Sequence, residues 1–159
     1  MLRIVGISEM YISSEPDDII ITYSLGSCIG VSIYDQKLKI GGMVHCMLPL
    51  SKIDPNKALE KPCMFTDTGI SCLLQNFLNM GSSRANLIIK TAGAASMLDE
   101  KNIFKIGERN YTVLKKIMWK NDLQIKAEDV KGTASRTMLL YMNSGKTTIK
   151  SGGKEGELI

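Results

Sequence analysis

A cysteine and a histidine are the two residues of this sequence whose types and spacing could support covalent catalysis. The segment Thr-Tyr-Ser-Leu-Gly-Ser-Cys, residues 22–28, passes from strand-forming residues into a Gly-Ser turn that ends on Cys28. His45 is the single histidine of the chain. A thiol beside an imidazole can lose its proton and attack a carbonyl carbon, and the imidazole can then protonate the leaving group. Such a pair could act as a nucleophile and its proton shuttle.

A local hairpin would bring this cysteine and this histidine together. Apolar residues alternate with small or polar ones over residues 28–34, which predicts a half-buried strand, and residues 40–48 predict the next one. A turn centred on Gln36-Lys37 pairs position 28 with position 45, and directly opposed residues share one face with Cβ atoms about 5 Å apart. A slip of one residue would place Cys46 there and turn His45 away.

Three further residues could complete the site. A catalytic imidazole usually needs a group that orients it. Thr22 ends the preceding strand, and the turn that follows would fold it back toward Cys28. Gly26 would allow close approach of a substrate. The Ser27 hydroxyl, with backbone N–H groups of the turn, could form an oxyanion hole.

Other interpretations of the same residues remain open at this point. A lone cysteine is more often an inert buried residue than a nucleophile, and a lone histidine on a strand is more often structural. A metal site built from the histidine and the cysteines is a third option, but the sequence has no C-x-x-C pair, which disfavours structural zinc. For Cys46, Cys63 and Cys72 we expect core or loop thiols, and Arg109 and Arg136 have no role that spacing predicts.

The composition indicates a globular protein of the cytoplasm. The chain has 159 residues and a net charge of +4, with lysines and arginines scattered among acidic residues, which gives no support for a nucleic-acid surface. No apolar run is long enough to span a membrane, and the N-terminus does not resemble a secretory signal. We therefore expect reduced thiols, a single domain over residues 1–150 and a flexible tail over residues 151–159.

The elements that would position the site follow from periodicity. Strands are predicted near residues 3–7, 18–23, 28–34, 40–48, 86–90, 124–130, 137–142 and 147–150, and helices from Thr66 or Asp67 to Gly81 and from residue 106 onward. Residues 51–65 contain two prolines and predict a long loop, which is often a functional lid. Mixed strands with a few helices predict an α+β or layered α/β domain.

The motifs, taken together, resemble a known family. L-G-S-C-I-G-V-S-I-Y-D (25–35) and I-G-G-M-V-H-C-M-L-P (40–49) are similar to the signature of the chemoreceptor glutamine deamidase family, CheD. The likeness continues through F-T-D-T-G-I (65–70), K-T-A-G-A-A-S-M (90–97), I-G-E-R-N (106–110) and D-V-K-G-T-A-S-R (129–136). Two positions depart from the family pattern, since Ala92 and Lys131 each stand where a glycine is usual.

The resemblance implies a fold, a reaction and partners. It implies a three-layer α/β/β sandwich, with Cys28 as nucleophile, His45 as general acid and base and Thr22 as the residue that orients His45. The implied reaction converts glutamine side chains of chemoreceptor cytoplasmic helices to glutamate through a thioester, with no metal or organic cofactor. A CheC-type phosphatase is a further implied partner. The alternative is an adaptor that binds receptors and phosphatase with or without chemistry, and another thiol acyl-transfer enzyme is a third possibility.

Overall fold

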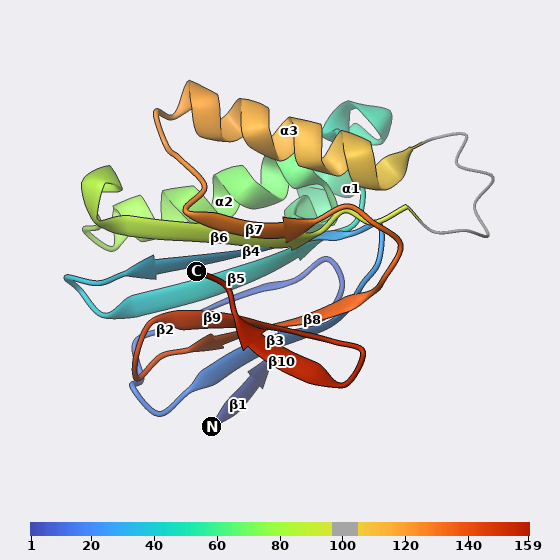
Figure 1. Cartoon of the computed structure of the whole chain (residues 1–159). Coiled ribbons are helices and arrows are strands. Elements are labelled where there is room, and N and C mark those ends of the chain that lie inside the picture. The colour runs from blue at the N-terminus through green and yellow to red at the C-terminus, as the bar shows by residue number, and fades with distance from the viewer. Residues whose placement is uncertain (97–104) are drawn as a thin grey trace.

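A computed structural model describes residues 1–96 and 105–159, which form two mixed five-stranded sheets and three α-helices (Figure 1). This confirms the α/β class. The strands are β1 (Leu2–Ile4), β2 (Met10–Ser13), β3 (Ile19–Leu25), β4 (Ile29–Asp35), β5 (Ile40–Cys46), β6 (Leu87–Gly93), β7 (Ala127–Val130), β8 (Arg136–Tyr141), β9 (Lys146–Ser151) and β10 (Lys154–Glu157). The helices are α1 (Pro55–Glu60), α2 (Thr66–Asn79) and α3 (Ile106–Lys120).

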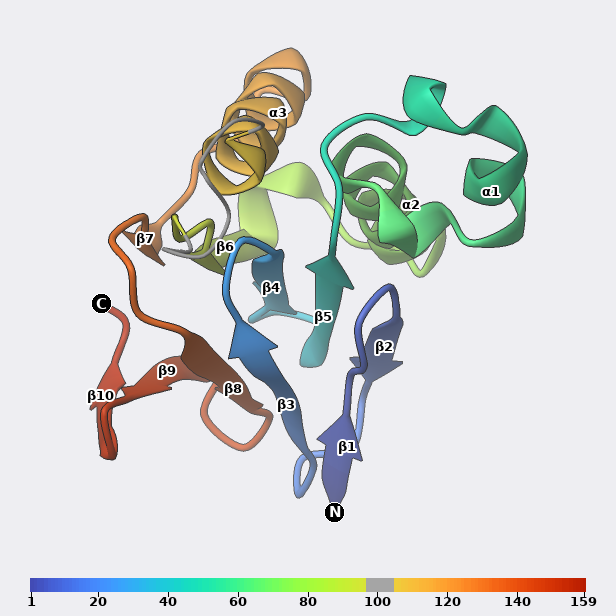
Figure 2. The ribbon, with the colours of Figure 1, turned by 90° about the vertical axis from the view of Figure 1, so that its right-hand side faces the viewer.

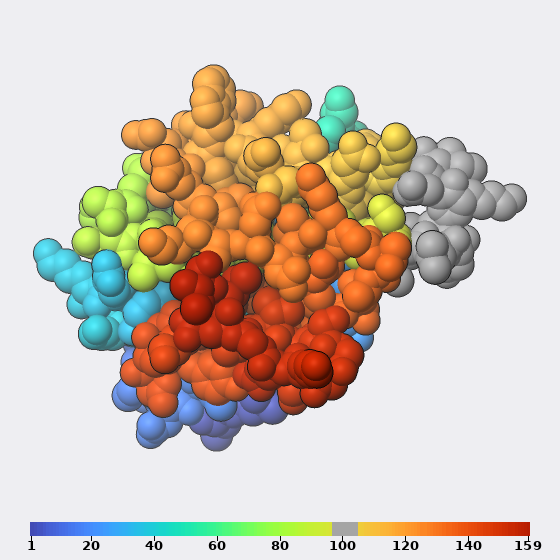
Figure 3. All heavy atoms as spheres, in the orientation of Figure 1, coloured from blue at the N-terminus to red at the C-terminus, as the bar shows by residue number. Residues whose placement is uncertain are grey.

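The elements are stacked so that one sheet lies between the helices and the other sheet (Figures 1 and 2). The helix-side sheet has the strand order β2-β5-β4-β6-β7, and the outer sheet has the order β1-β3-β8-β9-β10. Helices α2 and α3 cover the free face of the helix-side sheet. The strands β8 to β10 and helix α3 form much of the surface in Figure 3. No helix in the two described stretches is both long and apolar enough to cross a membrane.

Strands β4 and β5 are buried on both faces because they lie in the middle layer. Successive side chains of a strand point to opposite faces. Ile29, Val31 and Ile33 accordingly belong to the apolar cluster under the helices. Tyr34 and, on β5, Met43 belong to the second cluster, between the two sheets. Even-numbered residues of β4 and odd-numbered residues of β5 thus face the outer sheet.

The hairpin between β4 and β5 forms, but its register differs from the predicted one. Gly30, not Cys28, pairs with His45, and the turn is centred one residue later, on Lys37-Leu38. The predicted direct opposition of Cys28 and His45 is therefore wrong. The partner of position 28 moves by two residues, to Met47, and a shift of two keeps the same faces together. The slip of one residue that would have turned His45 away does not occur.

The segment predicted as a long loop contains short helices instead. Residues Ser51–Ile53 and Pro62–Met64 each form a 3₁₀ turn on either side of α1. The Asp54 carboxylate accepts a hydrogen bond from Lys57 N, and Pro55 occupies the first helical position, both of which favour a helix start. The Asp-Pro pair was the available signal for this helix.

Further details were not predicted. Strand β2 had no signal in the sequence, and β10, whose exposed residues pair with β9, lies within the tail over residues 151–159. The predicted cap of α2 is not formed, because the Asp67 carboxylate accepts hydrogen bonds from Ser51 and the Thr66 hydroxyl bonds to another helix. Met97, the last residue of one family motif, lies outside the described residues.

Candidate active site

The His45 ring is held by a threonine of the opposite sheet. Thr22 Oγ1 lies 2.7 Å from His45 Nδ1, and the same hydroxyl donates its hydrogen to the Val5 carbonyl oxygen at 2.7 Å. A hydroxyl has one hydrogen, so at the ring it can only accept. The proton of the neutral imidazole therefore sits on Nδ1, and the Nε2 atom carries a lone pair.

The Nε2 atom of His45 has no hydrogen-bond partner although it is buried. His45 is fully buried, and within residues 1–96 and 105–159 this nitrogen is the one buried side-chain polar atom left unsatisfied. Leaving a buried acceptor unsatisfied costs about 1–3 kcal/mol. A single unsatisfied polar atom among hydrogen-bonded buried side chains calls for an explanation, and a catalytic role is one such explanation.

Burial also sets the charge of the imidazole. Loss of hydration lowers the pKa of His45 from 6.5 to about 4. At pH 7 the ring is therefore neutral, with Nε2 able to take a proton. The protein at rest holds a base at this position rather than an imidazolium cation.

The same pKa predicts a pH dependence of stability. In the unfolded chain His45 binds a proton as the pH falls below 6.5. In the folded chain it binds that proton only when the pH falls to about 4. The free energy of unfolding should thus be fully retained above pH 6.5 and fall by up to about 3 kcal/mol on going to pH 4. Urea unfolding at pH 7.0, 5.5 and 4.5 would measure this slope. His45→Asn should flatten it, and a variant that keeps the full slope would contradict the assignment to His45.

Cys28 precedes β4 by one residue, but its side chain keeps the alternation of faces along that strand. Its carbonyl oxygen accepts a hydrogen bond from Ala94 N at 2.8 Å, which extends the ladder between β4 and β6. Its side chain packs against the apolar cluster between the sheets. The His45 side chain lies on the same face of its sheet, where it contacts Thr22 of the outer sheet. His45 stands opposite Gly30, so Cys28 is its diagonal neighbour. Diagonal positions of this kind are typically about 7–8 Å apart.

The turn before Cys28 is fixed by the segment that follows β6. Ala95 N donates to Gly26 O at 2.9 Å. Gly93 has a φ of +109°, and a Cβ atom there would collide with the Cys28 carbonyl oxygen, so glycine is needed at this close approach. The Gly26 N–H donates to Ser24 O, and it is therefore engaged within the turn rather than directed at a substrate. The close approach of a substrate at Gly26 and the part of the Ser27 hydroxyl in an oxyanion hole both stay predictions.

The other cysteines lie elsewhere, and all four are thiols in the structure. Cys46 points to the helix side and burial raises its pKa well above the usual value, while burial raises the pKa of Cys63 to about 11. Both are poor nucleophiles at neutral pH. Cys72 lies on α2 and is partly exposed. The described residues contain no group of three or more His, Cys, Asp or Glu side chains suited to a metal ion.

Two residues around the site, Asn110 and Arg136, have contacts that the sequence did not predict. Asn110 of α3 is fully buried and donates to Ser27 O at 2.9 Å and Met47 O at 3.2 Å. The I-G-E-R-N motif contained this residue, but its polar type on a helix gave no hint of burial. Arg136 is also buried, and it donates to the Gly93 carbonyl and pairs with Asp129. The Arg136 side chain therefore holds the end of β6, which in turn bonds to the Cys28 backbone.

The two departures from the family pattern have different settings. Ala92 is buried in β6, opposite Gly30, and its methyl group joins the cluster between the sheets. Lys131 adopts a φ of +72°, a left-handed conformation in which glycine is unstrained, which explains why glycine is usual there. Its ammonium group lies over the Tyr111 ring, 5.3 Å from the centroid.

The contact between threonine and histidine yields a direct prediction. Thr22→Val keeps the shape of the side chain but leaves the Nδ1–H without an acceptor, so the ring is free to rotate or change tautomer. We expect the catalytic rate to fall about 10- to 100-fold. Thr22→Ser, which restores the hydroxyl, should recover most of the rate. Equal rates for the valine variant and the wild type would show that Thr22 does not orient His45.

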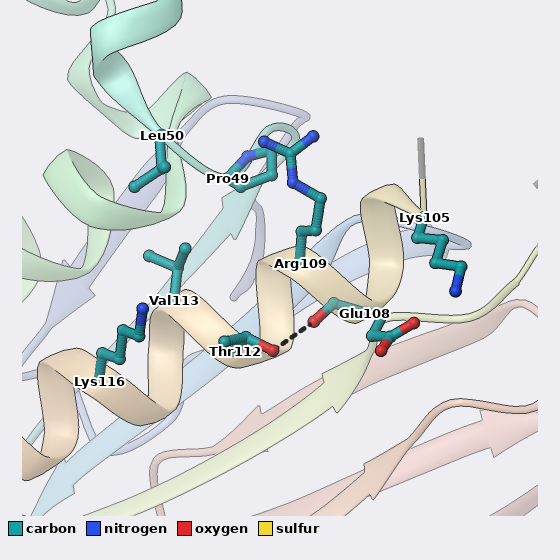
Figure 4. A pocket seen from close by; sticks show the side chains of 8 residues that line it. All are labelled: Pro49, Leu50, Lys105, Glu108, Arg109, Thr112, Val113 and Lys116. Carbon is teal, nitrogen blue, oxygen red and sulfur yellow. Dashed lines mark hydrogen bonds between the residues drawn. The ribbon is translucent and has the colours of Figure 1, made fainter. Parts of the chain in front are cut away.

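A groove runs along α3 (Figure 4). It has a volume of about 490 Å³ and is lined by Pro49, Leu50, Lys105, Glu108, Arg109, Thr112, Val113 and Lys116. Three of the lining residues, Pro49, Leu50 and Val113, are apolar, and three of the charged side chains are cationic against one carboxylate. It does not include Cys28 or His45, but Asn110 links its helix to the turn before Cys28.

The chain is similar to known proteins over nearly its whole length. A family model described as "CheD chemotactic sensory transduction" matches residues 47–151. A probable chemoreceptor glutamine deamidase CheD of Solibacter usitatus is 47% identical over 98% of this chain and 92% of its own length. A second such protein, from Syntrophus aciditrophicus, is 45% identical over 94% of each chain. The crystal structure of the Bacillus licheniformis hypothetical protein YfiH matches with a TM-score of 0.46 and 11% identity over 78% of this chain and 49% of its own, too little to support any inference. The chain belongs to the CheD family, whose members compared here are probable chemoreceptor glutamine deamidases.

Proposed function

We propose that this protein hydrolyses glutamine side chains of chemoreceptors to glutamate in the cytoplasm, as one α/β/β sandwich domain over residues 1–150. Cys28 is the nucleophile, His45 carries the proton and Thr22 orients His45. The observation that supports this most directly is the buried Nε2 lone pair of His45, fixed by Thr22 on the face that Cys28 shares. Four reduced thiols are consistent with the cytoplasm.

The first half of the reaction forms a thioester. The Cys28 sulfur attacks the glutamine Cδ atom while His45 Nε2 takes the thiol proton, which is the step that a neutral base permits. A tetrahedral intermediate forms, and its oxyanion lies near the turn that carries Ser27. His45 then gives its proton to the amide nitrogen, the C–N bond breaks and ammonia leaves. Cys28 remains acylated.

The second half restores the enzyme. A water molecule attacks the thioester carbon, and His45 Nε2 takes one of its protons. The C–S bond breaks, the proton passes from His45 to the Cys28 sulfur, and the glutamate side chain is released. One water is consumed and one ammonia is produced for each glutamine converted.

The groove along α3 is where we place the receptor helix. Its apolar lining residues and its three cationic side chains, Lys105, Arg109 and Lys116, complement an amphipathic helix with acidic side chains. The relatives compared above are named for chemoreceptors, which supports this substrate class. A CheC-type phosphatase, the second partner implied by the family, would compete for the same surface if it imitates the receptor.

The test is a direct assay of the reaction. Purified protein is incubated with a chemoreceptor cytoplasmic fragment, ammonia release is measured, and each glutamine-to-glutamate change is located by mass spectrometry. We expect conversion at discrete glutamines, slowed by high salt because the groove is cationic. Binding of the fragment with no conversion of any glutamine would favour the adaptor function instead, and a peptide-bond cleavage would favour a protease.

A further inference from the structure

The buried amide of Asn110 joins the two chain segments that carry the proposed nucleophile and base. Its Nδ2 group donates to the carbonyl oxygens of Ser27, at 2.9 Å, and Met47, at 3.2 Å. Ser27 immediately precedes Cys28, and Met47 lies two residues after His45. One side chain of α3 thus bonds to both ends of the catalytic hairpin.

This bridge lies where the hairpin itself stops. The ladder between β4 and β5 ends at the pair Ile29 and Cys46. Beyond it Leu48 pairs with the segment before α2 instead, since its N–H donates to Met64 O and its carbonyl oxygen accepts from Thr66 N, so the two strands separate. The Asn110 amide spans this opening. The amide therefore joins the two segments beyond the end of the ladder, next to Cys28.

The orientation of the amide is fixed as well. The Thr66 hydroxyl, at the start of α2, donates to Asn110 Oδ1 at 3.0 Å. With its oxygen occupied by a donor, the amide must present its two N–H bonds to the two carbonyl oxygens. Only a side chain with one acceptor and two donors satisfies these three partners. An aspartate at this position would direct acceptors at acceptors.

The helix that carries Asn110 is docked closely enough to keep this geometry. Gly107, one turn earlier, leaves no room for a Cβ atom because the backbone of Ala94 and Ala95 lies against it. The same two residues bond to Cys28 O and Gly26 O. The turn before Cys28 is therefore held from α3 by a side chain and from the β6 end by the backbone.

Building on the proposed function, we propose that Asn110 is a positioning residue that sets the distance and angle between the Cys28 thiol and His45 Nε2. It contacts neither the reacting atoms nor the substrate. Its effect should therefore appear in the chemical step and in the reactivity of the thiol, and not in the affinity for the receptor.

The test uses Asn110→Asp, which keeps size and removes the two donors toward carbonyl oxygens. Asn121→Asp is the matched control, because Asn121 caps the C-terminal end of the same helix and its Nδ2 group donates to Ile117 O, at the other end of α3 from Gly107. Circular dichroism and thermal melting establish that each variant is folded. We expect kcat on the receptor fragment to fall about 10- to 100-fold with KM unchanged.

A second readout does not depend on deamidation. Alkylation of Cys28 by iodoacetamide, located by mass spectrometry, reports whether His45 still activates the thiol. We expect Asn110→Asp to slow it and to shift its pH–rate profile to higher pH, with Asn121→Asp like the wild type. If the wild type deamidates nothing but this alkylation difference persists, the proposed function fails and the positioning role stands.

Thr66 provides an independent variant that does not add a charge. Thr66→Val releases the Asn110 oxygen from its donor and should reduce kcat in the same direction, whereas Thr66→Ser should retain it. Folded Asn110 and Thr66 variants with wild-type kcat and wild-type alkylation would overturn the proposal. So would variants in which alkylation becomes faster in step with a lower melting temperature, because that pattern indicates loss of stability alone.

Discussion

Cys28→Ala should remove glutamine conversion to below detection while leaving the fold and receptor binding intact. The alanine lacks the sulfur that forms the thioester, and no second thiol is placed to replace it. Cys46 points to the helix layer with a raised pKa, and Cys63 is buried there too with a pKa raised to about 11. Loss of a nucleophile in a covalent mechanism typically costs several orders of magnitude in turnover, about 10⁶-fold where it has been measured.

The measurement combines kinetics with trapping of the intermediate. Conversion is followed by mass spectrometry at receptor concentrations above KM, and rapid acid quenching should reveal an acylated Cys28 peptide in the wild type only. Cys72→Ala is the matched control, since Cys72 is the other partly exposed thiol and lies on α2. Full activity in Cys28→Ala, or its loss in Cys72→Ala instead, would assign the chemistry to a different residue.

The sequence predicted the faces of the site better than its contacts. Alternation over residues 28–34 and 40–48 correctly assigned two adjacent strands, because strands buried in a middle layer have strict period-two constraints. The exact pairing depended on the turn, where Asp35 accepts hydrogen bonds from Lys37 N and Leu38 N. With these hydrogen bonds the loop between β4 and β5 is two residues longer than the two-residue loop of a minimal hairpin. The alternation of residues along the strands does not predict this loop length.

Contacts between distant segments were the least accessible from sequence. Thr22 was predicted to reach His45, and a 2.7 Å contact is present, but the Val5 carbonyl that decides the tautomer was not foreseen. Asn110 gave no signal of burial, because an asparagine on a helix is ordinarily exposed. Long-range hydrogen bonds depend on how the layers stack, and this is a tertiary property that local patterns do not encode.

The variant His45→Asn should remove the proposed base while keeping the contact with Thr22. An asparagine amide nitrogen can occupy the place of Nδ1 and keep the hydrogen bond to Thr22, but nothing replaces the Nε2 lone pair. General acid and base catalysis contributes about 10²- to 10⁴-fold, and His45 acts in both halves of the proposed reaction. We therefore expect kcat to fall by about 10³-fold or more with receptor affinity unchanged.

The pH profile of the same variant gives a second, qualitative signature. In the wild type the rate should decline only toward acid pH, because burial lowers the pKa of His45 to about 4 and the base is neutral above it. In His45→Asn the residual rate should rise steadily with pH, since the thiol must now lose its proton to solvent. Thr22→Val retains Nε2 and should keep the wild-type profile at a reduced rate. A His45→Asn protein with normal kcat, or with an unchanged profile, would show that the imidazole is structural and that the unsatisfied nitrogen has another cause.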